Sequence, residues 1–293
     1  MKILLLGAKG QVGWELRRAL SSKGDVMACG RSEADLSKPD DLRSILKTAK
    51  ANIIVNAAAY TAVDKAETEH DLAECINHEA VAILAAHAKQ SDALLIHYST
   101  DYVFDGTKSA PYVETDPTNP ISVYGATKLR GEEAVSVSGC NHIIFRTGWV
   151  YAPRGQNFVK TMLRLAQERE ELSVVADQIG APTSAALIAE VTAQTLSMPV
   201  LSGIYHLTAS GETSWHRFAQ VILAEAQKRG LLLKAGPAHV KAIETSAYPT
   251  PAKRPANSRL NTDKLRTALR LALPAWEEHV QRVVAALVTE SKK

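Results

Sequence analysis

A glycine-rich turn near the start of the chain is the feature that most constrains its fold. A short apolar run at residues 2–6 leads into GAKGQVG at residues 7–13, a GxxGxxG spacing, and a helical pattern follows over residues 11–21. A Cβ at these glycines would block the tight turn and keep the backbone from approaching a pyrophosphate. The amino end of the helix offers free N–H groups and partial positive charge to that anion. The order of strand, turn and helix therefore predicts a dinucleotide-binding unit.

The same alternation of short apolar runs and amphipathic stretches continues through the first half of the chain. The expected strands, which are brief and rich in Ile, Val and Leu, are residues 2–6, 25–29, 53–57, 93–98 and 142–146. The expected helices between them are residues 11–21, 40–50, 71–90 and 124–137. Strict alternation produces right-handed crossovers, so the sequence predicts an α/β fold with a doubly wound, parallel Rossmann sheet. Ligands of such sheets bind beyond the carboxyl ends of the strands.

The regular alternation of short apolar runs and amphipathic stretches ends at about residue 150. The expected elements there are helices at residues 157–169, 184–196 and 214–229, a strand at 203–208 and an irregular loop at 245–258, with Ser214 as a helix N-cap. We expect residues 1–150, with roughly 183–209, to form the NAD(P)-binding domain. Residues 151–182 and 210–293 are expected to form a smaller C-terminal substrate-binding region that packs closely against it and leaves a cleft between the two parts.

Composition and charge exclude several classes of protein. The 293 residues carry 34 Lys and Arg against 31 Asp and Glu, and a net charge of +3 spread along the chain gives no case for nucleic-acid binding. No apolar run is long enough for a membrane span, and the run after Lys2 is too short for a secretory signal. The three cysteines are far apart and form no CxxC pair or disulfide framework, which predicts a cytoplasmic protein.

The end of the second expected strand bears on which nucleotide is bound. NAD-preferring sites place a carboxylate there for the ribose hydroxyls, but this chain has Gly30 and Arg31. A guanidinium suits the 2′-phosphate of NADP, although Arg31 as a solvated surface residue is the alternative. Asp35 could accept a hydrogen bond from the adenine amine or could instead cap a helix. We predict a preference for NADPH without excluding NADH.

A Tyr–Lys pair predicts the chemistry. Tyr124 and Lys128 are four residues apart and therefore share one face of an expected helix. A nearby ammonium is expected to lower the pKa of the phenol, so that Tyr124 could give a proton to a carbonyl oxygen as hydride arrives at the carbon. Thr100, at the end of an expected strand, could donate a hydrogen bond to the same oxygen. A helical Tyr–Lys pair is usually a solvated face, but here it follows a nucleotide fingerprint and a strand-end Ser-Thr pair.

Two further positions are candidates for substrate contacts. Trp149 lies just past the fifth expected strand, where an aromatic ring could stack on a sugar, shield the site from solvent or simply belong to the core. Lys253 and Arg254 lie in the irregular loop, where they could face a diphosphate or form an exposed basic pair. The sequence shows no metal-ligand spacing, and we assign no metal site.

Taken together, these motifs resemble the extended short-chain dehydrogenase/reductase family. The segments that carry the resemblance are GAKGQVGWEL (7–16), NAAAYTAVDKAE (56–67), HYSTDYVFDG (97–106), YGATKLRGE (124–132), FRTGWVYA (145–152), DQIGAPTS (177–184) and RPANSRL (254–260). They span nearly the whole chain and are most similar to the branch of the family that acts on dTDP-4-keto-6-deoxy sugars. The resemblance implies reduction of the C4 ketone of dTDP-4-dehydro-6-deoxy-L-mannose to dTDP-L-rhamnose, the last step of dTDP-rhamnose biosynthesis.

The resemblance also implies roles for individual residues. It implies catalytic roles for Thr100, Tyr124 and Lys128, and sugar contacts for Thr100, Asp101 and Trp149. The expected cofactor-binding residues, from the motifs and the resemblance together, are Gly7, Gly10, Gln11, Val12, Gly13, Gly30, Arg31, Asp35, Leu36, Ala59, Tyr60, Thr61, Tyr98, Tyr124 and Lys128. The family places an acid at position 30 where this chain has glycine, which agrees with the Arg31 argument.

The sequence leaves the oligomeric state, a metal ion and some alternative functions open. Some family members bind Mg²⁺ at a dimer contact, so a homodimer and a non-catalytic Mg²⁺ are allowed, with Glu15 and Glu190 as acidic candidates. A nucleotide-sugar dehydratase would need an acid after Asp101, where this chain has Tyr102. The remaining alternatives are another nucleotide-sugar epimerase or oxidoreductase of the family, and a non-catalytic regulatory subunit on the same fold.

Overall fold

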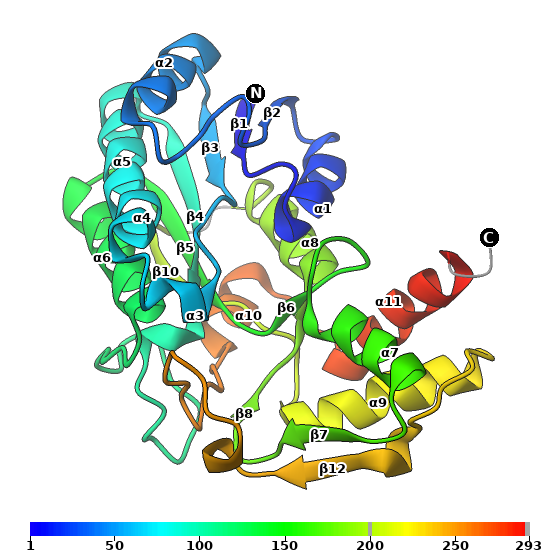
Figure 1. Cartoon of the computed structure of the whole chain (residues 1–293). Coiled ribbons are helices and arrows are strands. Elements are labelled where there is room, and N and C mark those ends of the chain that lie inside the picture. The colour runs from blue at the N-terminus through cyan, green and yellow to red at the C-terminus, as the bar shows by residue number, and fades with distance from the viewer. Residues whose placement is uncertain (199–200, 291–293) are drawn as a thin grey trace.

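A parallel six-stranded sheet lies at the centre of the molecule (Figure 1). The computed structural model describes residues 1–198 and 201–290. The strand order is β10-β5-β4-β3-β1-β2, and neighbouring strands pair in parallel. The strands are β1 (Lys2–Leu6), β2 (Asp25–Cys29), β3 (Ile53–Asn56), β4 (Leu94–Thr100), β5 (His142–Thr147) and β10 (Gly203–His206). All five strands expected in the first half are confirmed, and the order reverses at β1, as in a doubly wound sheet.

Both faces of the sheet are covered, because successive residues of each strand point to opposite sides. Ile3 and Leu5 of β1 join the core that contains Leu16 of α1 (Gln11–Leu20) and Ile188 of α8 (Ala185–Thr195). Leu4 and its alternate neighbours join the second core, beneath α2 (Pro39–Ala49), α5 (Ala80–Ser91) and α6 (Val123–Ser138). Both layers are visible in Figure 1. The continuous apolar runs of the sequence follow from this double burial.

The helix expected over residues 71–90 is interrupted. The chain instead forms α4 (His70–Glu74), a π-helical turn η1 (Cys75–Glu79) and then α5, and a short helix α3 (Val63–Ala66) precedes them. Within the π-turn, the side chain of Asn77 is fully buried and hydrogen-bonds the backbone of Tyr60. The apolar spacing could not reveal this turn, because its cause is a hydrogen bond to a distant segment.

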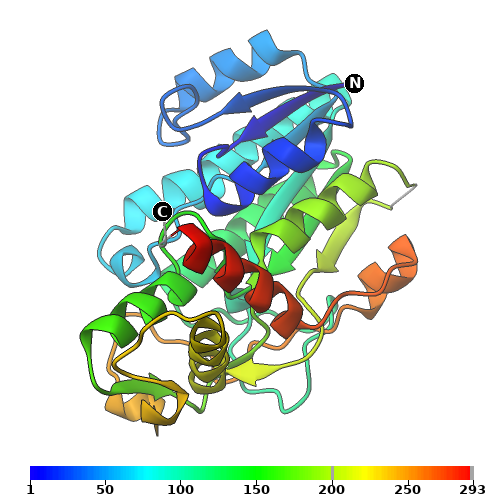
Figure 2. The same ribbon diagram turned by 90° about the vertical axis from the view of Figure 1, so that its right-hand side faces the viewer.

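The C-terminal part of the chain lies beyond the carboxyl ends of the strands (Figures 1 and 2). Its helices are α7 (Phe158–Glu168), α9 (Trp215–Lys228), α10 (Asp263–Leu269) and α11 (Trp276–Glu290). Short strands pair β7 (Leu172–Val175) with β12 (Val240–Ile243), β8 (Ile179–Gly180) with β11 (Thr213–Ser214), and β6 (Val150–Tyr151) with β9 (Thr183–Ser184). The structure also has single 3₁₀ turns. One, η2 (Asp101–Val103), follows β4, and two lie in the C-terminal part, η3 (Pro237–His239) and η4 (Thr245–Ala247).

The expected helices of this half are confirmed as α7, α8 and α9. Ser214 caps α9, since its Oγ accepts a hydrogen bond from the Arg217 N–H at 3.1 Å. The expected strand at 203–208 ends earlier, at His206. Apart from η4, the stretch 245–258 is irregular. The predicted domain ranges 183–209 and 210–293 include residues 199–200 and 291–293, which lie outside the described residues. No helix in the described ranges is long and apolar enough to cross a membrane.

Candidate active site

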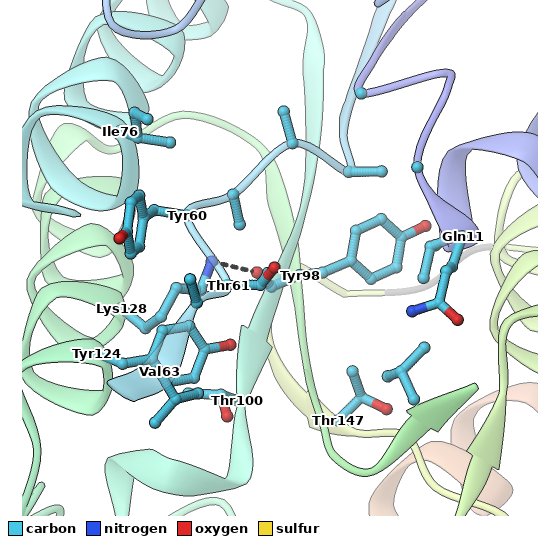
Figure 3. Close-up of a pocket in the computed structure, with 18 of the residues that line it drawn as sticks. Gln11, Tyr60, Thr61, Val63, Ile76, Tyr98, Thr100, Tyr124, Lys128 and Thr147 are labelled. Carbon is cyan, nitrogen blue, oxygen red and sulfur yellow. Dashed lines mark hydrogen bonds between the residues drawn. The ribbon is translucent and has the colours of Figure 1, made fainter. Parts of the chain in front are cut away.

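One cavity of about 880 Å³ opens beyond the carboxyl ends of the central strands. Its lining comes from the turn after β1, the ends of β2 and β3, the strands β4 and β5, and the helix α6 (Figure 3). The segment from α3 to η1 adds residues such as Val63 and Ile76, and the C-terminal part adds Gln156, Phe158, Trp215 and Phe218. The predicted site residues found in this lining are Gly7, Gly10, Gln11, Val12, Gly30, Arg31, Asp35, Leu36, Ala59, Tyr60, Thr61, Tyr98, Thr100, Asp101, Tyr124, Lys128 and Trp149.

Two positions of the glycine-rich turn, Gly7 and Gly13, have no room for a side chain. Gly7 has φ +77°, and a Cβ there would lie 2.6 Å from the Ala58 backbone nitrogen. A Cβ at Gly13 would lie 2.0 Å from the carbonyl oxygen of Gly7, so Gly13 acts behind the cavity by letting α1 approach the turn. No acidic residue lies in the first turn of α1. The turn therefore offers a helix N-terminus and bare backbone to an anion such as a pyrophosphate.

Two cations flank the end of β2. Arg31 is largely exposed, and its Nε lies 3.2 Å from Asp35 Oδ2. Lys9, which sequence reasoning did not select, reaches across from the glycine-rich turn and donates to Ser32 Oγ at 3.0 Å. Glu33 Oε2 accepts a hydrogen bond from the Gly30 N–H at 2.8 Å. This carboxylate is outside the cavity lining, whereas Gly30 and Arg31 are part of it.

Asp35 holds the local turn while it lines the cavity. Its Oδ1 accepts from the Ser37 N–H at 3.0 Å and from the Ser37 hydroxyl at 2.7 Å. These hydrogen bonds, together with Arg31, hold the pKa of Asp35 below its usual value although burial opposes them. Asp35 is not the helix cap of the alternative interpretation, because the N-cap of α2 is Lys38. Its Oδ1 already accepts two hydrogen bonds, whereas Oδ2, which accepts from Arg31, keeps a lone pair for a ligand.

Asn77 fixes the segment that follows β3. Its Oδ1 accepts from the Tyr60 N–H at 2.9 Å, and its Nδ2 donates to the Tyr60 carbonyl at 3.1 Å. The same Nδ2 donates to Thr127 Oγ1 on α6, at 3.1 Å. One buried amide therefore joins the segment containing Tyr60 to the helix that carries Tyr124 and Lys128. Sequence reasoning missed Asn77, because nothing in the local pattern separates it from other polar helix residues.

Tyr98 contributes its ring and its backbone to the cavity. Its hydroxyl lies 2.7 Å from Thr192 Oγ1 of α8, and burial raises the pKa of Tyr98 well above its usual value. Its carbonyl oxygen accepts a hydrogen bond from Lys128 Nζ at 2.6 Å, drawn as the dashed line in Figure 3.

Lys128 is buried at the floor of the site. Besides the Tyr98 carbonyl, its Nζ lies 3.3 Å from His97 Nε2. Only 2% of the residue is exposed, and burial lowers the pKa of Lys128 to about 8. Burial also holds the pKa of His97 well below its usual value, with the charge on Lys128 adding to the effect. The free protein thus holds its ammonium group at a carbonyl and a neutral imidazole.

The expectation that Lys128 lowers the pKa of Tyr124 is wrong for the free protein. Burial raises the pKa of Tyr124 to about 12, and a hydrogen bond with the Thr100 side chain lowers it only in part. The ammonium makes no such contribution, because it is directed to the Tyr98 carbonyl. Tyr124 therefore carries its proton throughout the neutral range.

Thr100 and Asp101 form a buried pair beside Tyr124. Thr100 Oγ1 donates to Asp101 Oδ1 at 2.9 Å and accepts from the Tyr102 N–H at 3.1 Å. Asp101 Oδ2 is buried and makes no hydrogen bond to any residue that the structure describes. Burial raises the pKa of Asp101 to about 7. The Thr100 hydroxyl is therefore engaged with Asp101, and which of the two groups donates depends on whether Asp101 is protonated.

Trp149 forms an aromatic stack at the boundary between the two parts of the chain. Its ring lies 3.6 Å from that of Trp215, with an angle of 7° between the planes. Its Nε1 donates to Ser258 Oγ at 3.2 Å, and its backbone has φ +51°, a strained conformation for a bulky residue. Trp215 was missed by sequence reasoning, since a tryptophan at a helix start has no distinctive pattern.

Arg254, like Gly13, is a predicted site residue that lies outside the cavity lining. Its guanidinium donates to Asp64 Oδ2 at 2.8 Å, and it approaches the cavity only through its charge on Tyr102. Within the described ranges, no group of three or more His, Cys, Asp or Glu could hold a metal ion. Of the acidic candidates, Glu15 pairs with Arg18 at 3.2 Å and Glu190 is exposed.

Comparisons with known proteins agree with this geometry. A profile of the family described as "RmlD substrate binding domain" matches residues 1–289. A dTDP-4-dehydrorhamnose reductase of Burkholderia thailandensis is 50% identical over 99% of this chain and 100% of its own. The protein of that name from Escherichia coli K12 is 49% identical over 99% of both chains. A crystal structure of Bacillus anthracis dTDP-4-dehydrorhamnose reductase in complex with NADP superposes with a TM-score of 0.90, at 36% identity, over 98% of this chain and 100% of that chain.

The fold and its cavity thus define an NAD(P)H-dependent oxidoreductase of the extended short-chain dehydrogenase/reductase class. More narrowly, the chain belongs to the RmlD family of dTDP-4-dehydrorhamnose reductases.

Proposed function

We propose that this enzyme uses NADPH to reduce the C4 ketone of dTDP-4-dehydro-6-deoxy-L-mannose, which gives dTDP-L-rhamnose in the last step of dTDP-rhamnose biosynthesis. The observation that carries the proposal is the meeting of Tyr124, Thr100 and Lys128 in the same cavity as the glycine-rich turn. Relatives about 50% identical over the whole chain bear the name of this activity.

The cavity fits a nicotinamide dinucleotide. Gly7 and Gly13 have no room for a Cβ, which supports a pyrophosphate at the turn, with Gly10, Gln11 and Val12 beside it. Asp35 and Leu36 would take the adenosine end. The remaining contacts would come from Ala59, Tyr60, Thr61, Tyr98, Tyr124 and Lys128. When bound, NADPH supplies the hydride that reduces the ketone carbon.

The protein's own residues supply the proton and the orientation. Tyr124 keeps its proton at neutral pH and would release it only to the strongly basic oxygen that forms as the ketone is reduced. Lys128 would hold the nicotinamide ribose, and its positive charge would stabilise the negative charge that develops on the Tyr124 oxygen as the proton leaves. Asp101 and Trp149 would contact the sugar, and Arg254 would face the diphosphate if it left Asp64.

We further propose that residues 1–150 with roughly 183–209 hold the cofactor, and that residues 151–182 and 210–293 hold the substrate. Supporting this division, Phe158, Trp215 and Phe218 line the cavity opposite the glycine-rich turn. The enzyme would favour NADPH over NADH, because Arg31 and Lys9 together place two cations at the corner that a 2′-phosphate would enter.

An NADPH oxidation assay with dTDP-4-dehydro-6-deoxy-L-mannose and a panel of other nucleotide ketoses tests the proposal. We expect turnover with the dTDP sugar at a kcat/KM well above that of the panel. Purified protein that retains nicotinamide and interconverts sugars without net oxidation would instead indicate an epimerase. Absence of turnover with intact nucleotide binding would indicate a regulatory subunit.

A further inference from the structure

Three buried, unpartnered polar side-chain atoms meet at the candidate site. They are Ser99 Oγ, Asp101 Oδ2 and Thr147 Oγ1, and their residues all line the cavity. A buried polar atom without a hydrogen bond is costly, so a cluster of such atoms in one cavity marks a place where a ligand completes the contacts. Among the three, only Asp101 can ionise, and its charge state decides which hydrogen bonds its neighbours can make.

The surroundings of Asp101 favour its neutral form. Just 3% of the residue is exposed, and the absence of a Cβ at Gly148 makes room for its carboxyl, since a Cβ there would lie 2.4 Å from Oδ2. The groups that favour the charged form are the Thr100 hydroxyl, the nearby Ser258 hydroxyl and backbone N–H groups, and these do not offset the loss of hydration.

The charged and titratable groups around Asp101 come from several elements. Tyr102 of η2 and Tyr124 of α6 feel its charge, and both are phenols that stay neutral. Arg254 acts on Tyr102 but is paired with Asp64. Lys128 of α6 directs its ammonium to the Tyr98 carbonyl and to His97. Across the described residues, no cation is paired with Asp101.

Thr100 can be arranged in two ways between Asp101 and Tyr124. A hydroxyl donates one hydrogen bond and accepts two, and one acceptor position is taken by the Tyr102 N–H. If Asp101 is ionised, Thr100 donates to it and is left to accept from the Tyr124 hydroxyl, which turns the phenol proton away from a substrate. If Asp101 is protonated, it donates to Thr100, Thr100 donates to the Tyr124 oxygen, and the phenol proton is free to face the ketone.

We propose that Asp101 is a positioning residue that, in its protonated form, points the proton of Tyr124 at the ketone and supplies the proton that replaces it. The proposal rests on the proposed function and deepens it. As hydride adds to the ketone carbon and the C=O π electrons move to oxygen, that oxygen takes the Tyr124 proton. Tyr124 takes the proton of Thr100, and Thr100 takes that of Asp101. The reaction leaves Asp101 as a carboxylate, which water then protonates.

The pH dependence of hydride transfer tests this directly. In single-turnover experiments with NADPH and the dTDP ketose, we expect the wild-type rate to fall about tenfold per pH unit once Asp101 ionises. Asp101→Asn should transfer hydride more slowly and should not show this fall, because an amide donates to Thr100 at every pH. Asp92→Asn, an exposed acid-to-amide control on the loop before β4, should keep the wild-type profile. Profiles of equal shape in wild type and D101N would overturn the proposal.

Infrared spectroscopy provides a second test that requires neither substrate nor turnover. Wild-type protein at neutral pH should show the carbonyl stretch of a protonated carboxyl group that D101N lacks, and this band should disappear as the pH is raised. If D101N proves unstable, the pH titration of the band in wild type serves alone. A carboxylate at Asp101 throughout the neutral range would contradict the proposal. The infrared test involves no reaction, so its outcome does not depend on the proposed function. A failure of the proposed function would instead appear in the NADPH oxidation assay.

Discussion

Burial makes Tyr124 a phenol that keeps its proton until an oxygen basic enough to take it is formed. Its ring packs edge-on against Tyr102 at 6.0 Å, so removal of the hydroxyl leaves the packing in place. Tyr124→Phe should therefore bind NADPH nearly as tightly as wild type and turn over roughly a hundredfold or more slowly, as expected for a lost general acid. Steady-state kinetics with a fluorescence titration of NADPH check this. Near-normal turnover would contradict the assignment.

Burial of the Lys128 ammonium lowers the free energy of unfolding of the protein. Its pKa falls from 10.5 to about 8 on folding, so the charged form destabilises the folded state below pH 8, and this penalty fades as the pH rises toward 10.5. The stability of wild type relative to Lys128→Met should therefore rise between pH 8 and 10, on the order of 2 kcal/mol. Urea unfolding at several pH values measures this. Lys47→Met, at an exposed lysine, should show no such trend, and a flat difference for K128M would contradict the buried charge.

Arg31 and Lys9 carry the prediction of cofactor preference. Arg31→Ala should raise the KM for NADPH about tenfold, the scale of one charge-assisted phosphate contact, and should leave the KM for NADH almost unchanged. Lys9→Ala should act in the same direction. Arg43→Ala, an exposed arginine of α2, is the control and should affect neither cofactor. A clear preference of the wild-type enzyme for NADH would contradict the interpretation that glycine in place of an acid at position 30 favours NADPH.

At the scale of elements, the π-turn η1 connects the segment containing Tyr60 to α6, the helix that carries Tyr124 and Lys128. Asn77→Asp would place a carboxylate oxygen where Nδ2 now donates to Tyr60 and Thr127, so two acceptors would face it. We expect a loss of about 2–3 kcal/mol in the free energy of unfolding and weaker NADPH binding. Asn52→Asp, an exposed site whose Oδ1 only accepts from Lys2, should change stability by less than about 0.5 kcal/mol. Calorimetry and urea unfolding separate these outcomes.

Sequence patterns predicted the elements whose signals are local. The strands β1, β3, β4 and β5 and the glycine turn were predictable, because burial on both faces and the steric need for glycine are visible in adjacent residues. The edge strand β2 is partly exposed and was predicted from its short apolar run alone. The π-turn at Asn77, the helices α10 and α11 and the two-residue strands were not predictable, because they depend on contacts between segments far apart in the chain. β6 and β9, for example, pair residues 150–151 with 183–184.

At the scale of the whole molecule, the site is built by both parts of the chain. The indole rings of Trp149 and Trp215 stack across the boundary, and Trp149 is further held by Ser258. Sequence reasoning selected most of the residues on the side of this cavity formed by the glycine-rich turn and the strand ends, where the motifs lie. It could not find Trp215, or the unpartnered oxygen of Asp101, because three-dimensional packing alone brings them to the cavity. It also misjudged the pKa of Tyr124, because burial does not show in residue spacing.

Direct transfer of hydride from the nicotinamide to the sugar C4, opposite the hydroxyl of Tyr124, is the central claim. NADPH that carries deuterium at both C4 positions of the nicotinamide should be incubated with the enzyme and dTDP-4-dehydro-6-deoxy-L-mannose, and the product examined by NMR. The account predicts one deuterium at C4 of a dTDP-L-rhamnose product, formed far more slowly by Tyr124→Phe. A product without deuterium at C4, or equal rates in wild type and variant, would contradict it.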